Sequence, residues 1–90
     1  MRTTIVKIHG QTQPYDEHKL YASLYASCLS IQTPGGEAEI TARHVVKGLR
    51  PWLKGKPEVT SHDIRLKAAQ LLQPYNPHAA YIYKHHGNIH

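Results

Sequence analysis

The sequence predicts an α+β domain in which a small sheet caps a four-helix bundle. The sheet is either a β-hairpin or a three-stranded sheet. In an extended conformation, the side chains of residues 3–9 would point alternately to the two faces of a strand, and many of them are β-branched. Both features are typical of a strand. Four later stretches carry apolar residues at helical spacing. The β-prone segment 58–60 lies between the second and third stretches and offers a third strand. Ninety residues suffice for one domain, so residues 1–90 are expected to form a single unit.

The hairpin is predicted from residues 3–9, a turn at Gly10 and a returning strand over residues 12–15. Pro14 lacks a backbone N–H and cannot donate to a ladder, so the returning strand should be short or lie at an edge. Asp16 then caps the first helix, which ends near Ser30.

The second helix is expected from Glu37, and Pro51 should kink it or close it one turn early. Ser61 is expected to cap the third helix. Asn76, followed by a proline at the first helical position, predicts the start of the fourth helix, with a frayed tail from His85.

The formal net charge of +5 favours anionic partners, namely nucleic acid, anionic lipid or phosphorylated small molecules. The single cysteine, Cys28, fits a reducing compartment. The N-terminus has no apolar core of a signal peptide, and no run approaches the ~20 apolar residues of a membrane span. We therefore expect a cytoplasmic protein with no membrane contact.

Two lysines lie close to the predicted start of the first helix: Lys7 on the hairpin and Lys19 one turn into the helix. Ammonium groups near a helix N-terminus form a site suited to phosphate. Gln13 and Asp16, between them in the chain, carry oxygen atoms that can accept from an adenine amino group.

A base needs apolar walls, and the third helix offers further phosphate contacts. The walls are expected from four residues: Ile5, Tyr15, Leu20 and Ile64. Ser61 offers a hydroxyl and unpaired backbone N–H groups at a helix start, and Arg65 lies one turn further, within reach of a ribose or phosphate.

Three blocks of the N-terminal region resemble the opening pattern of the ATP-cone family: residues 5–10 (IVKIHG), 13–16 (QPYD) and 19–20 (KL). Residues 57–64 resemble the family's lead into its third helix, and residues 79–85 its closing helix, so the resemblance covers nearly the whole chain. ATP-cones regulate ribonucleotide reductases and form the nucleotide-sensing half of a bacterial repressor of reductase genes. The resemblance implies an allosteric domain that binds ATP or dATP, accompanied by Mg²⁺. Its partner would be a reductase-like protein or regulator, and family members often form homo-oligomers.

The resemblance assigns a role to each matching position: the phosphate side to Lys7, Lys19 and Ser61, the adenine side to Gln13 and Asp16, and the ribose side to Arg65. Three positions depart from the family pattern. Ile8 replaces the usual arginine, which removes a phosphate contact, and His9 replaces the usual aspartate. Gln13 replaces the usual glutamate, and its amide donates as well as accepts.

An enzyme is not expected. There are no paired carboxylates, and Cys28 lies on an apolar stripe without an indicated base. The C-terminal histidines, His85, His86 and His90, lack the spacing of a structural metal site, so no metal is expected.

Two alternatives compete with the nucleotide-binding interpretation. One is a small basic nucleic-acid-binding module, indicated by four cations near the end of the second helix: Lys47, Arg50, Lys54 and Lys56. The other is a structural interaction domain whose nucleotide site has decayed, indicated by Ile8 and Gln13.

Overall fold

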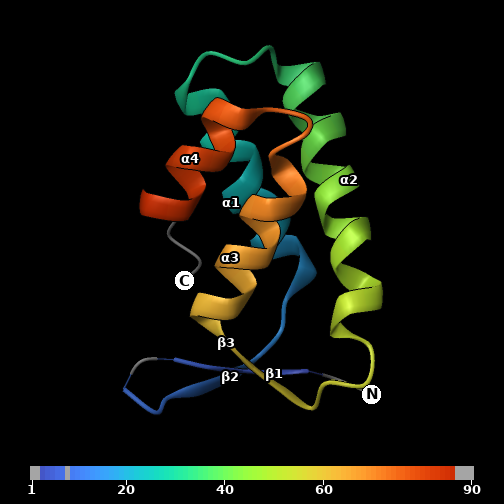
Figure 1. Ribbon diagram of the computed structural model, residues 1–90, viewed down its shortest axis with the longest axis vertical. Helices are drawn as coiled ribbons and strands as arrows, with labels where there is room; N and C mark the ends of the chain where they lie inside the picture. The colour runs from blue at the N-terminus through green and yellow to red at the C-terminus, as the bar shows by residue number, and fades with distance from the viewer. Residues whose placement is uncertain (1–2, 8, 87–90) are drawn as a thin grey trace.

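The computed structural model describes residues 3–7 and 9–86, and within them it is an α+β fold of four helices and a three-stranded mixed sheet (Figure 1). The strands are β1 (Thr4–Val6), β2 (Thr12–Pro14) and β3 (Glu58–Thr60). The helices are α1 (Glu17–Ser30), α2 (Gly35–Leu53), α3 (Ser61–Leu72) and α4 (Pro77–His86). The Cα radius of gyration is 12.4 Å, close to the ~12 Å expected for a compact chain of this length. The predicted α+β class and element order are therefore confirmed.

The sheet has the order β2-β1-β3, with β1 antiparallel to β2 and parallel to β3. Ile5 pairs with Gln13 on one side and with Val59 on the other. Paired residues point to the same face of a sheet. Ile5 and Val59 are buried and Gln13 is half-buried, so this face is the one that the helices cover.

A tight turn closes the hairpin between β1 and β2. The Lys7 N–H donates to the Gln11 carbonyl (2.7 Å), and the Gly10 N–H donates back to the Lys7 carbonyl (2.9 Å). Gly10 has a φ of 81°, which glycine adopts without the steric cost that a side chain adds. β2 lies at the edge of the sheet, as Pro14 predicts.

Helix α1 begins as the sequence predicts, with the Asp16 side chain accepting from the backbone N–H groups of its first turn. Helix α2 begins at Gly35, two residues before the predicted start at Glu37. It continues through Pro51 to Leu53, so of the two outcomes predicted at this proline, early closure of the helix is wrong. The Lys54 N–H donates to the Arg50 carbonyl (3.1 Å), which closes the last turn around the proline. Burial of Leu53 in the core stabilises this turn, so tertiary packing overrides the local preference.

The cap of α3 is Thr60, so the assignment of Ser61 as the cap was wrong. The Asp63 N–H donates to Thr60 Oγ1 (3.0 Å), and Ser61 is the first helical residue. Thr60 ends β3 and already has the extended backbone that an N-cap requires. Helix α4 begins as predicted, with Asn76 Oδ1 accepting from the Ala79 N–H (3.1 Å). It continues to His86, so the tail predicted from His85 does not begin there.

The helices pack in a cycle, since α1 contacts α2 and α4, and α3 also contacts α2 and α4. All four lie on one side of the sheet, with α1 and α3 running away from it and α2 and α4 running back (Figure 1). The largest fully buried side chains of the core come from all four helices: Leu20, Leu24, Cys28, Val45, Leu49, Ile64, Leu72 and Tyr83. Within the described residues, no helix has the length and apolarity to cross a membrane.

Candidate functional site

The end of β1 lies beside the start of α3. Val6 pairs with Thr60 in the parallel register, so the residues that follow them, Lys7 and Ser61, leave the sheet at the same end. Lys7 directly follows β1 and is half-exposed, and continuing the alternation of the strand would put it on the Ile5 side, which faces the helices. The hairpin turn, the start of α3 and the end of α4 lie on the same side of the molecule in Figure 1. The fold thus brings together Lys7 and Ser61, which are more than fifty residues apart.

Arg65 lies one turn along α3 from Ser61 and on the same face of that helix. It is half-buried, and its Nη2 lies 3.0 Å from His62 Nδ1. Its Nε is buried and has no hydrogen-bond partner among the described residues. A buried donor without a partner costs about 1–3 kcal/mol, so a side-chain arrangement in which this guanidinium met an added acceptor would be favoured over the ligand-free one.

Tyr83 of α4 and Ser23 of α1 join the two helices next to this region. The Tyr83 side chain is 0% exposed, and its hydroxyl lies 2.9 Å from Ser23 Oγ. Ser23 Oγ already donates to the Leu20 carbonyl (2.8 Å), so the hydrogen between the two hydroxyls belongs to Tyr83. Burial raises the pKa of Tyr83 to about 12, although the Ser23 hydrogen bond and the Arg65 guanidinium act in the opposite direction. The tyrosine therefore stays protonated.

Lys19 precedes Ser23 by one turn on the same face of α1, so it lies nearer the sheet than the Tyr83 hydroxyl. Sequence reasoning missed Ser23 and Tyr83, because a tyrosine at helical spacing indicates ordinary packing. Only the contact between residues 60 positions apart identifies them as polar members of this region.

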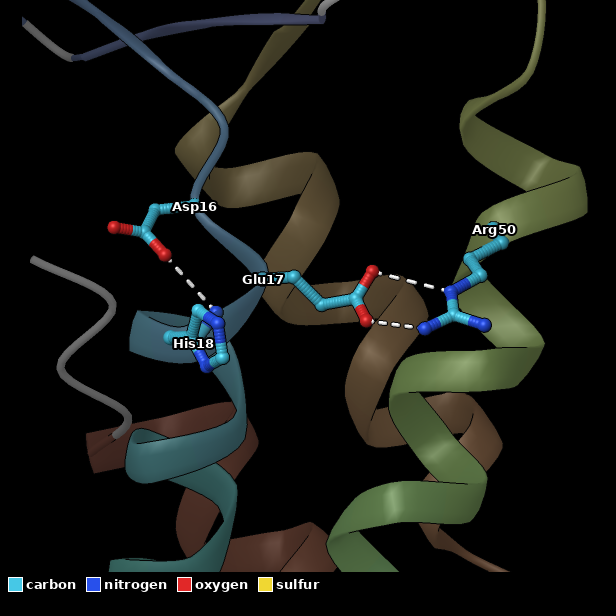
Figure 2. A network of polar contacts seen from close by, with 4 residues as sticks. All are labelled: Asp16, Glu17, His18 and Arg50. Carbon is cyan, nitrogen blue, oxygen red and sulfur yellow. Dashed lines mark hydrogen bonds and ion pairs between the residues drawn. The ribbon is translucent and has the colours of Figure 1, made fainter.

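The first two acidic residues of the chain have different roles. Asp16 Oδ1 accepts from the backbone N–H groups of His18 (2.9 Å) and Lys19 (3.3 Å), which is the interaction of a helix cap. Glu17 reaches across to α2, where Arg50 Nε and Nη2 donate to its two carboxylate oxygens. Figure 2 shows the two carboxylates pointing in opposite directions. The hydrogen bond from Arg50 holds the pKa of Glu17 below its usual value.

An open groove of about 880 Å³ lies between the β2–α1 junction and the α2–β3 connection. Of the residues predicted to bind nucleotide, Tyr15 and Asp16 line it. The Tyr15 hydroxyl is buried without a partner among the described residues, and burial raises its pKa. Arg50, Lys54 and Lys56 line the same groove together with Asp16 and Glu17, so its walls carry three cations and two carboxylates.

The predicted apolar walls are part of the main core. Ile5, Leu20 and Ile64 belong to one cluster and are between 0% and 2% exposed. Gln13 lies beside Ile5 on the covered face of the sheet. Ile8 lies outside the described residues, so its predicted place in the site is not described.

Metal ligands were not expected from the sequence. Within residues 3–7 and 9–86, no group of three or more His, Cys, Asp or Glu side chains is placed to hold a metal ion. Compared with known proteins, the sequence matches no family model and no curated protein. The resemblance to the ATP-cone family stays a prediction that rests on the residues quoted above.

Proposed function

We propose that this chain is a regulatory adenine-nucleotide-binding domain that holds ATP or dATP where the sheet meets the neighbouring ends of α1, α3 and α4. The observation that carries the proposal is the buried Nε of Arg65, a cationic donor without a partner among the described residues, one turn into α3. Phosphate and ribose oxygens are acceptors, and a phosphate also supplies the charge that a guanidinium pairs with.

The phosphates occupy the space at the start of α3. The N-terminus of a helix has a positive dipole end and backbone N–H groups that point outward. Thr60 caps the helix, so the Ser61 hydroxyl is not used as the cap and is available to a ligand. Lys7 emerges beside Ser61, and Lys19 approaches from α1. Three cationic side chains and a helix N-terminus then surround the phosphates.

The adenine lies toward the β2–α1 junction. Gln13 is on the covered face of β2, and its amide can both accept from the adenine amino group and donate to a ring nitrogen. Asp16 uses Oδ1 for the helix cap, and its Oδ2 accepts a second hydrogen from the amino group. A carboxylate with two oxygens can serve both purposes.

The cyclic contacts among the helices support the finer description of the fold as a four-helix bundle capped by the sheet. This is the arrangement that the ATP-cone resemblance implies. The domain would then have no catalytic residues of its own and would act in the cytoplasm. It would change its association with a reductase-like partner, a gene regulator or further copies of itself when nucleotide binds.

Isothermal titration with ATP and with dATP, each with and without Mg²⁺, tests the proposal. We expect saturable binding of one nucleotide per chain. Replacing Lys7 and Lys19 together by alanine should weaken binding by at least about 150-fold, because each charge-assisted contact contributes about 1.5–3 kcal/mol. The matched control, Arg43→Ala with Lys47→Ala, removes the same charge from exposed positions of α2 outside the groove of Tyr15 and Asp16. It should leave the affinity within about twofold, because surface charges add little at a distance.

Two results would overturn the proposal. One is the absence of heat and of any thermal shift at millimolar nucleotide. The other is equal affinity of wild type and the Lys7→Ala, Lys19→Ala variant, which would place any binding elsewhere. Either result would favour a structural interaction domain whose nucleotide site has decayed.

A further inference from the structure

A row of cations follows the outer face of α2 and its C-cap residue, Lys54, and we call this row the α2 stripe: Arg43, Lys47, Arg50 and Lys54. Their spacing is four, three and four residues. At 100° per residue the four side chains lie within about 60° of one another around the helix axis, over a length of about 16 Å. All four are exposed, whereas the buried residues of α2 lie on the opposite side of the helix.

Two members of the stripe are paired and two are not. Arg43 binds Glu39 (2.6 Å) and Arg50 binds Glu17, both at the surface. Lys47 and Lys54 have no ion-pair partner within the described part of the chain. The four cations of the stripe therefore exceed their two carboxylate partners, and exposed pairs of this kind are weak enough to exchange for another anion.

The surroundings extend the positive surface. Lys56 follows α2, with its Nζ 4.9 Å from the centre of the Trp52 ring, and it lines the open groove beside Arg50 and Lys54. On the other side of the stripe, a second groove of about 450 Å³ contains Arg43 and Lys47 with the half-buried Tyr21 of α1. The side chains of the stripe thus line a hollow on each side, Lys56 adds a fifth cation, and Glu17 lines both hollows.

A regularly spaced row of cations fits a polyanion with regularly spaced charges. Successive members of the stripe are separated by about 4.5–6 Å along the helix. A membrane surface is a poorer match, because a helix that lies on a membrane inserts its apolar face into the lipid. The apolar face of α2 is already buried in the protein core.

We propose that the α2 stripe binds the phosphate backbone of nucleic acid without reading its sequence. This surface lies on α2, whereas the proposed nucleotide site involves β1, β2 and the other three helices; the two adjoin at the groove that Arg50 and Lys54 line together with Tyr15 and Asp16. Binding to the stripe draws on the release of counterions, so it should weaken steeply as salt is added. Four phosphate contacts would give a slope of about −3.6 for the logarithm of the association constant against the logarithm of the salt concentration.

Fluorescence anisotropy with a labelled DNA duplex, over a series of salt concentrations, tests this proposal on the whole chain. The test variant is Lys47→Glu with Lys54→Glu. The matched control is Lys67→Glu with Lys84→Glu, which makes the same change in net charge on α3 and α4. The test variant should bind at least about 60-fold more weakly at 0.1 M salt, because each lost contact is worth about eightfold there, and its slope should be shallower by about two. The control should retain most of the wild-type affinity.

Three outcomes would overturn the inference: no binding even at low salt, an equal loss for the two variants, or binding to anionic phospholipid vesicles without binding to the duplex. Titration of Lys47→Glu alone with ATP separates the two proposals, because Lys47 does not line the groove of Tyr15 and Asp16. Its nucleotide affinity should be unchanged while its affinity for the duplex falls, so either proposal can fail without the other.

Discussion

Replacement of Arg65 by methionine should stabilise the nucleotide-free protein and abolish its response to nucleotide. The guanidinium of Arg65 is half-buried, and its Nε has no partner among the described residues. Methionine keeps most of the apolar stem and removes the buried donor. A residue that costs stability in the free protein and contributes to binding would be a sign of a functional site.

The size of the effect follows from the contacts. Removing an unsatisfied buried donor recovers about 1–3 kcal/mol. The contact between Arg65 Nη2 and His62 Nδ1 is exposed, and its loss costs about 0.5–1 kcal/mol. The net gain is therefore about 1 kcal/mol, which for a domain of this size raises Tm by about 4–8 °C.

Thermal unfolding with and without ATP measures both effects. At a nucleotide concentration 100 times Kd, wild type should gain about 2.7 kcal/mol of stability, whereas Arg65→Met should gain little. Arg43→Met is the matched control, because Arg43 is exposed and paired with Glu39. Its Tm should change by only about 1–2 °C and its response to ATP should be that of wild type.

A fall in Tm of Arg65→Met, together with an undiminished response to ATP, would refute the reasoning. It would mean that Arg65 stabilises the fold through its packing and takes no part in binding. A fall in Tm together with a lost response would leave Arg65 as a binding residue but would disprove the cost assigned to its buried Nε.

Three further predictions concern the fold. Thr60→Ala should lower the free energy of unfolding by about 1 kcal/mol and Ser61→Ala by much less, measured by urea denaturation, because Thr60 carries the cap hydrogen bond; equal losses would contradict this assignment. Gly10→Ala should lower the free energy of unfolding by about 1 kcal/mol, because Gly10 has a φ of 81°. Gly10→Asn should lower it less, since asparagine tolerates this conformation. Equal losses for the two variants would argue against the turn. Glu17→Gln should cost about 0.5 kcal/mol at neutral pH. Arg50 lowers the pKa of Glu17 in the folded state, so this stabilisation is present above the unfolded pKa and disappears as the pH falls through the lower, folded pKa; a difference that persists in strong acid would contradict it.

The positions of most elements follow from the sequence because their signals are local. Asp16 and Asn76 bond to N–H groups two or three residues away, so their roles as caps can be read from neighbouring residues. The turn at Gly10 depends on the backbone freedom of one residue. Local signals failed where two choices were nearly equal in energy, as for adjacent Thr60 and Ser61, or where burial outweighed propensity, as in the last turn of α2.

The candidate site shows the same division. Its residue types, the lysines, the glutamine and the carboxylate near a helix start, are evident in the sequence by itself. Their placement is not, because it depends on the parallel pairing of β1 with β3, which brings Lys7 beside Ser61. Similarly, only packing joins Tyr83 to Ser23 and buries the Arg65 Nε. Such contacts depend on the closure of long loops and the filling of a shared core, and neither is encoded within a few residues of any one position.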